Sequence, residues 1–172
     1  LSSPSFAGHR FPIRRQVQFF VEYAEQAEKL ETAYERLRLF LWLTTDYARR
    51  NPDWARLLYL EVWPSVLIKE ARVREVVDDY ARIVLALIEE GEERGEWPHD
   101  PDSYQTTTIL VGSVSQLIIT WLIYRRPRDV SRAAAPLIER MLTLLTHPPA
   151  IGARASAGDG SEKLTQLSGK RR

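Results

Sequence analysis

Between residues 13 and 146, apolar side chains recur three or four positions apart, which is the spacing of one face of an α-helix. Within this region no stretch alternates apolar and polar residues over the length of a strand, and no Asn-Gly or Asp-Gly pair marks a hairpin. The pattern predicts an all-α fold, an antiparallel bundle of about six helices. We expect helices over residues 13–30, 32–50, 51–63, 65–93, 100–124 and 129–146, the first with its apolar stripe at Val17, Phe20, Val21 and Ala24.

Several of these helices carry recognisable ends. Thr32 and Glu35 have the spacing of a capping box, in which each side chain bonds the other residue's backbone N–H. At Asn51-Pro52 a capping residue is followed by a proline in the first turn, where a missing N–H costs nothing. Gly91 and Gly95 are candidate helix ends, because glycine readily adopts the left-handed conformation that closes a helix.

The segment 103–124 contains no charged residue and is apolar around most of its circumference. A helix that is apolar all round is covered on all sides, by protein or by a membrane, and about 20 apolar residues are long enough for a membrane span. A thin polar stripe along this helix suits the wall of a cavity that orients a mostly apolar ligand, or hydroxyls that bond neighbouring carbonyls. The stripe comprises Thr106, Ser113, Gln116, Thr120 and Tyr124.

The last helix also has a broad apolar face. Two such helices in a small domain predict a two-fold, four-helix dimer interface over residues 103–124 and 129–146. The residues that we expect in this interface are Val111, Ser115, Ile118, Leu122, Ala134, Ile138, Met141 and Leu145.

The ends of the chain differ in composition from its middle. Residues 1–12 are small and polar and contain two prolines, so we expect a flexible arm. Residues 148–172 have few large apolar side chains, and we expect a disordered tail because too little surface can be buried to offset the chain entropy. Residues 13–147 are predicted to form one domain.

Composition narrows the possible chemistry. The 24 Lys and Arg against 23 Asp and Glu give a formal net charge of +1, without the basic excess typical of a domain that grips nucleic acid. There is no cysteine, so disulfides and zinc–thiolate sites are ruled out. The histidines lack metal-ligand spacing, and no nucleophile elbow or phosphate loop is present. We therefore expect no metal, no cofactor, no catalytic residue and no enzyme activity.

The order of motifs over residues 31–147 resembles the regulatory half of the tetracycline-repressor (TetR) family. Asn51-Pro52 opens a helix, and residues 88–97 look like the family's I-x-E-G-x-x-x-G-x-F turn with Trp in the aromatic place. Residues 112–121 look like its G-x-x-x-x-L-x-x-x-W helix, most of all in members similar to fatty-acyl-CoA-responsive repressors. The three-helix DNA-binding domain that precedes this half in the family is not found in the sequence.

The resemblance implies a cytoplasmic transcription regulator that works as a homodimer and would reach DNA only through the missing N-terminal domain. Its middle helices enclose a pocket for a hydrophobic small molecule, with fatty acyl-CoA as the specific expectation, and the ligand changes the dimer geometry and the DNA affinity. Glu61 stands among apolar residues, where a buried carboxylate needs a partner, although a surface-facing Glu is the simpler interpretation. We expect the ligand site to include Thr44, Tyr47, Leu58, Glu61, Val62, Tyr80, Val84, Ser113, Gln116 and Thr120.

Two other classes of protein fit the same sequence. A stand-alone helical dimer that binds no ligand should have a solid interior, whereas a sensor needs an enclosed cavity of at least about 300 Å³. A membrane-anchored bundle would place residues 103–124 in the bilayer and the basic run Arg125, Arg126 and Arg128 on the cytoplasmic side.

Overall fold

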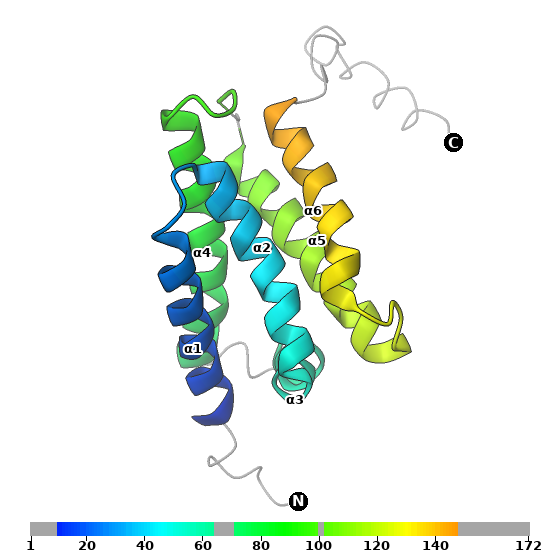
Figure 1. Cartoon of the computed structure of the whole chain (residues 1–172). Coiled ribbons are helices and arrows are strands. Elements are labelled where there is room, and N and C mark those ends of the chain that lie inside the picture. Colours follow the sequence, from blue (N-terminus) through cyan, green and yellow to red (C-terminus); the bar gives the residue numbers. More distant parts are fainter. Residues whose placement is uncertain (1–9, 64–70, 100–101, 148–172) are drawn as a thin grey trace, which may run out of the picture.

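The computed structural model describes residues 10–63, 71–99 and 102–147, and within these ranges the chain is helical with no strand. The long helices run up and down the bundle in alternating directions (Figure 1). The prediction of an all-α fold is confirmed. The helices are α1 (Arg10–Ala27), α2 (Ala33–Arg50), α3 (Pro52–Arg56), the π-helix η2 (Leu57–Val62), α4 (Ala71–Glu93), α5 (Ser103–Tyr124) and α6 (Val130–Thr146).

The first helix begins earlier than expected. Residues 10–12, which we assigned to a flexible arm, form the first turn of α1. The rest of that arm (1–9), the expected start of the fourth helix (65–70) and the expected tail (148–172) lie outside the described residues. The other helix boundaries agree with the expected ones to within three residues.

Side-chain caps hold three of the helix starts. The capping box at the start of α2 is present, with the Glu35 N–H donating to Thr32 Oγ1 (3.1 Å) and the Thr32 N–H to Glu35 Oε2 (3.2 Å). Asp102 caps α5 by accepting from the Gln105 N–H at 2.9 Å, and Asp129 caps α6 in the same way.

Asn51 does not cap α3 as expected. Its amide nitrogen donates to the Tyr47 carbonyl at the end of α2 (3.0 Å), and its amide oxygen accepts from the Arg15 guanidinium on α1 (3.1 Å). Because α1 packs against the junction of α2 and α3, the Asn51 side chain links α1 to α2 instead of capping α3.

α2 is the central helix and contacts every other described α-helix. Its apolar residues Leu37, Phe40 and Leu41 are buried, and the polar side chains of Thr44, Thr45 and Asp46 also have almost no exposed surface. Asp46, the buried carboxylate among them, pairs with Arg49 (2.8 Å) and Arg50 (2.7 Å), so its charge is compensated at the edge of the bundle. The buried residues of α2 are Ala33, Leu37, Phe40, Leu41, Leu43, Thr44, Thr45, Asp46, Tyr47 and Ala48.

α1 turns a different face inward from the one its apolar stripe suggested. Val17 and Val21 are 56% and 51% exposed, whereas Gln16 and Phe19 are almost fully buried. Phe19 decides this orientation, because its ring packs edge-on against Phe40 of α2, with 5.5 Å between the ring centroids.

The chain widens into a π-helix directly after α3. In η2 the Trp63 N–H donates to the carbonyl of Leu58, five residues back, at 2.9 Å. The wide turn places Tyr59 and its neighbours Leu58 and Val62 in the core and leaves Glu61 on the surface. Such turns within helices frequently occur at functional sites.

A tight turn after α4 explains the Gly-x-x-x-Gly-x-Trp pattern. Gly95 has a φ of +70° and closes the helix, and the Glu96 N–H then bonds the Gly91 carbonyl at 2.8 Å. The buried indole of Trp97 folds back and donates to the Ile88 carbonyl at 3.1 Å. A Cβ on Gly91 would lie 2.0 Å from the Trp97 ring, so only glycine fits there.

The same turn reaches across the bundle to α2. The Glu96 carboxylate accepts from the backbone N–H groups of Ala33 (2.9 Å) and Tyr34 (2.8 Å), and Arg94 pairs with it at 3.1 Å. A carboxylate at a helix N-terminus satisfies unpaired donors and opposes the positive end of the helix dipole. Glu96 therefore joins the end of α4 to the start of the central helix.

We expect Gly91→Ala to lower the free energy of unfolding by about 1–3 kcal/mol, because the new methyl overlaps the Trp97 ring. Gly112 is the matched control, a mid-helix glycine of α5 whose Cβ would meet open space. Gly112→Ala should be neutral or raise stability by up to about 1 kcal/mol through helix propensity. Urea unfolding followed by circular dichroism measures both, and equal effects of the two substitutions would contradict the packing argument.

Candidate functional site

A buried hydroxyl pair lies at the centre of the bundle, between α2 and α4. Thr44 Oγ1 is 2.8 Å from the Tyr80 hydroxyl and also donates to the Phe40 carbonyl at 2.8 Å. Burial raises the pKa of Tyr80, because the phenolate would be left without solvent in an apolar interior, and the hydrogen bond to Thr44 opposes this only in part. Tyr80 therefore stays neutral and acts as a hydrogen-bonding group.

A second hydroxyl pair lies beside the first. Tyr59 on η2 lies close enough to Ser115 on α5 for the serine hydroxyl to lower its pKa, but burial has the larger effect and raises the pKa of Tyr59 well above its ordinary value. The proximity of Tyr80 raises it further. Four hydroxyl groups from four elements thus meet in one region of an otherwise apolar interior.

Aromatic rings enclose this region on the side of α1. The Tyr80 ring lies 4.7 Å from that of Phe40 and 6.4 Å, stacked, from that of Phe19, measured between centroids. Phe19 in turn packs edge-on against Phe20 at 5.4 Å. These rings surround the hydroxyl groups with a large area of rigid apolar side chain.

Gln16 adds an unused acceptor near these rings. It lies one turn before Phe19 and Phe20 on α1, its side chain is almost fully buried, and its Oε1 atom has no hydrogen-bond partner within the protein. A buried unsatisfied acceptor is costly, which makes it a candidate contact for a ligand donor or a water.

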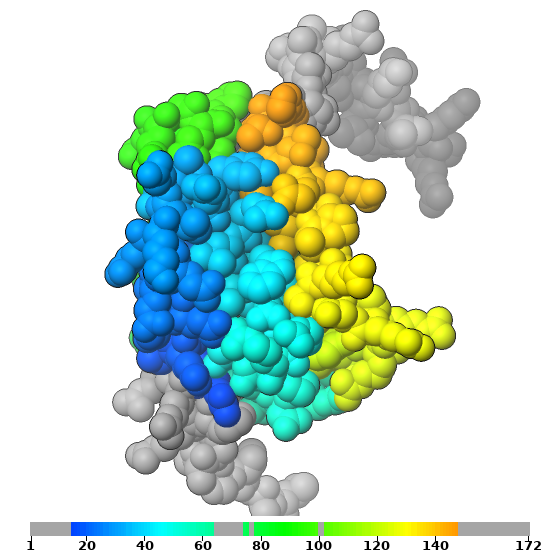
Figure 2. Space-filling view, in the orientation of Figure 1, coloured from blue at the N-terminus to red at the C-terminus, as the bar shows by residue number. Residues whose placement is uncertain are grey.

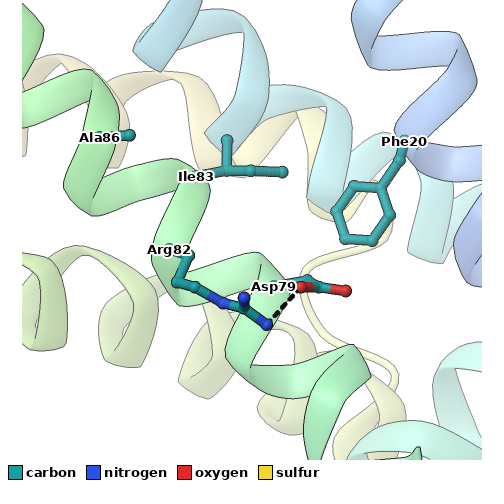
Figure 3. Close-up of a pocket in the computed structure, with 5 residues that line it drawn as sticks. All are labelled: Phe20, Asp79, Arg82, Ile83 and Ala86. Carbon is teal, nitrogen blue, oxygen red and sulfur yellow. Dashed lines mark hydrogen bonds and ion pairs between the residues drawn. The ribbon is translucent and has the colours of Figure 1, made fainter.

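A groove of about 280 Å³ opens on the outer side of the aromatic layer. Figure 3 shows Phe20 of α1 facing Ile83 of α4 across it, with the Asp79–Arg82 ion pair at one side. Because Phe20 touches Phe19, and Phe19 touches Tyr80, two rings separate this groove from the buried hydroxyl pairs. The groove is lined by Phe20, Asp79, Arg82, Ile83 and Ala86.

The expected ligand residues fall into two groups. Those on α2, η2 and α4 are buried, with Tyr47 at the junction of α1 and α3, where its hydroxyl donates to the Arg15 carbonyl at 2.8 Å. Glu61 points to solvent, which corrects its assignment as a buried anchor. The buried members are Thr44, Tyr47, Leu58, Val62, Tyr80 and Val84.

The remaining expected ligand residues lie on the outer side of α5. Gln116 is exposed and donates to the Thr120 hydroxyl one turn later at 3.3 Å, and Ser113 and Thr120 are half-buried. The hydrogen bond within the stripe agrees with the second interpretation of these polar groups, that they bond their neighbours, and their place in a ligand site stays a prediction. A helix that is apolar on all sides carries no contrast from which its rotation can be read.

The expected interface residues turn inward for the same reason. All of these residues except Ser115 are already buried within the single chain, so a partner chain could not bury them further. Ser115 is half-buried and lies close to Tyr59. These positions belong to the core, which corrects their assignment; the buried ones are Val111, Ile118, Leu122, Ala134, Ile138, Met141 and Leu145.

Sequence reasoning missed the inner role of Ser115 and of Tyr59, and it missed Gln16. The only signal for Gln16 was its spacing of three residues from Phe19, whereas the neighbouring valines suggested the opposite face. Among the described residues no group of acidic or histidine side chains is placed to hold a metal ion.

α5 is long and apolar enough to cross a membrane, by length and composition, and it is alone in this among the described helices. In the bundle its inner side packs against α2, α4 and α6. Its outer side leaves Ile109 and Ile123 more than half exposed, and Leu144 on α6 is equally exposed.

Such a bundle, with paired hydroxyls in an aromatic interior, is the C-terminal region of a TetR-family transcription regulator. Within that class the chain belongs to the family described as YsiA-like protein, C-terminal region, whose model matches residues 13–145. The family resemblance is thereby confirmed, and membership in a family of transcription regulators agrees with the expectation that the chain is not an enzyme.

Two solved structures share the fold. The transcriptional regulator FadR from Bacillus subtilis, in complex with stearoyl-CoA, has a TM-score of 0.66 and 22% identity, over 78% of this chain and 70% of that one. The fatty acid degradation regulator FadR from Bacillus halodurans has a TM-score of 0.68 and 16% identity, over 82% of this chain and 71% of that one. No curated protein matches the chain by sequence.

A double-mutant cycle tests the hydroxyl pair at the centre of the site. Thr44→Val and Tyr80→Phe each remove one hydroxyl at nearly constant shape, and we expect a coupling free energy of about 1 kcal/mol between them. The control cycle combines Thr44→Val with Tyr47→Phe, whose hydroxyl bonds the Arg15 carbonyl instead. Chemical unfolding measures both cycles, and a coupling below about 0.3 kcal/mol in the first would argue against a formed hydrogen bond.

Proposed function

We propose that this chain is the ligand-sensing and dimerisation region of a cytoplasmic transcription regulator, and that its ligand is a hydrophobic small molecule with a long acyl chain, carried as a fatty acyl-CoA. The observation that carries this proposal is the group of four hydroxyls, three of them on buried residues and that of Ser115 on a half-buried one, within an aromatic and aliphatic interior. Few polar groups in a mostly apolar surround are typical of sites that orient an apolar ligand. The fold shared with a FadR that holds stearoyl-CoA supports the choice of ligand.

The charges around the interior restrict what part of the ligand can enter. Asp46 is the one charged side chain among the buried residues that the structure describes, and two arginines already neutralise it. An unpaired charge in such a place would be strongly disfavoured. An acyl chain and its neutral thioester carbonyl therefore suit the interior, whereas the phosphates of the CoA group must remain at the surface.

The outer side of α5 and α6 is proposed as the dimer face. Ile109, Ile123 and Leu144 are 54–55% exposed on these two helices, and the residues between them on α5 are uncharged. A second copy that packs the same face covers these side chains by two-fold symmetry in a four-helix arrangement. A ligand that enters between α2, α4 and α5 then shifts the helices that carry this face, which changes the dimer geometry and the position of attached DNA-binding domains.

Acyl-CoA binding is measured by native mass spectrometry and titration calorimetry, with palmitoyl-CoA and octanoyl-CoA as ligands. We expect one ligand per chain, with the longer acyl chain bound more tightly because each buried methylene contributes about 0.8 kcal/mol. Tyr80→Phe should weaken palmitoyl-CoA binding by roughly three- to tenfold through a lost hydrogen-bonding group. Tyr34→Phe, which removes a hydroxyl that bonds Glu139 outside the expected site, should leave binding unchanged. A chain that binds neither ligand, with a solid interior, would favour the stand-alone helical dimer instead.

The dimer face is tested by a pair of double variants at equally exposed apolar positions. Ile109→Glu/Ile123→Glu on α5 should raise the dimer dissociation constant roughly a hundredfold or more, because unpaired carboxylates would be buried in the interface. Val17→Glu/Val21→Glu on α1 places the same charges on another face and should leave the dimer intact. Analytical ultracentrifugation without detergent reports the masses. A monomeric wild-type chain, or a chain that stays in solution only with detergent, would rule out this assignment.

A further inference from the structure

The turn between α5 and α6 carries a concentration of positive charge. Figure 2 shows the turn as a projection at the lower edge of the bundle. Four arginines on the turn and at the start of α6 are exposed, and none of them has a carboxylate within ion-pair distance. Most other arginines that the structure describes form an ion pair with a carboxylate. We name this group the arginine turn: Arg125, Arg126, Arg128 and Arg132.

The backbone of the arginine turn is held in place from both sides. Arg125 adopts a left-handed conformation (φ 55°) and its N–H closes α5 on the Trp121 carbonyl at 2.8 Å. Asp129 starts α6 and is the carboxylate within the turn, but its oxygen is occupied by the Arg132 N–H (3.0 Å) and the Ser131 hydroxyl (2.8 Å). The guanidinium groups therefore project from an ordered frame, and none of them forms an ion pair with Asp129.

The arginine turn lies at the same end of the bundle as the start of α1. In Figure 1 both are at the lower end, together with the end of α2. Two interactions agree with this placement. The Tyr47 hydroxyl near the end of α2 donates to the Arg15 carbonyl on α1, and the positive charge of Arg49 on α2 lies close enough to Asp129 to lower its pKa. In a full-length regulator of this family, the part that precedes the matched C-terminal region joins it at α1. The turn thus lies at the end of the bundle where α1, the first described helix, begins.

We propose that the arginine turn binds the phosphodiester backbone of duplex DNA, so that the sensing region itself contributes to DNA affinity. The inference rests on the proposed role in transcription regulation, but not on ligand binding. Arginines that contact phosphates supply affinity without reading sequence, and each contact releases condensed counterions from the DNA. The formal net charge of +1 does not oppose this, because the field that a phosphate meets depends on the local arrangement of charges, and four exposed arginines lie within eight residues of the chain here.

The test measures anisotropy of a labelled, random-sequence DNA duplex titrated with the full 172-residue chain over a range of salt concentrations. We expect weak binding whose logarithm falls linearly with log salt. Arg126→Gln/Arg128→Gln should reduce that slope by about 2 and weaken binding at low salt by tenfold or more, as two phosphate contacts are lost. The matched control Lys29→Gln/Arg140→Gln removes the same charge from two exposed side chains, one just after the end of α1 and one in the second half of α6, and should change neither quantity.

Equal losses in the two double variants would overturn the proposal, because net charge rather than the arginine turn would then govern binding. So would a chain that ignores DNA at low salt, or one whose arginine turn binds phosphatidylglycerol vesicles in preference to duplex DNA, which would indicate a membrane partner. Native mass spectrometry of the unsubstituted chain with palmitoyl-CoA separates the two hypotheses. A chain that binds DNA through the arginine turn but does not bind acyl-CoA contradicts the ligand assignment alone.

Discussion

The burial of α2 is the constraint on which the other helices depend. Ten of its 18 residues are buried, including the unbroken run 43–48, and α1, α4, α5 and α6 each cover part of it. Its buried start needs donors satisfied from outside the helix, and the Glu96 carboxylate supplies this from the turn after α4. That turn exists only because Gly91 leaves room for the Trp97 ring, so the family's glycine pattern is explained by the needs of the central helix.

Polar groups inside this packing are arranged in pairs. A buried hydroxyl without a partner is costly, and Thr44 with Tyr80 and Tyr59 with Ser115 are each placed together without introducing charge. The pairs join α2 to α4 and η2 to α5, so a molecule that competes for these contacts acts on several helices at once. This coupling gives a physical basis for a sensor in which the ligand changes helix positions rather than a single contact.

Overall charge and local charge give different impressions of this protein. A nearly even count of basic and acidic residues argued against nucleic-acid binding when only composition was considered. In the folded chain many acidic side chains form ion pairs or cap helices, including Asp46, Glu96 and Asp129. The arginine turn has no such partners, and only its place in the fold sets it apart from the other basic residues.

Helix boundaries could be placed from local chemistry along the chain, because a cap or a left-handed glycine acts on residues three or four positions away. Thr32, Asp102 and Gly95 are examples, and the one-sided stripe of α2 indicated its inner face equally well. The rotation of α5 was beyond such reasoning. Its sequence is apolar on every side, so several orientations bury similar surface, and only its packing against α2, α4 and α6 decides which side faces inward.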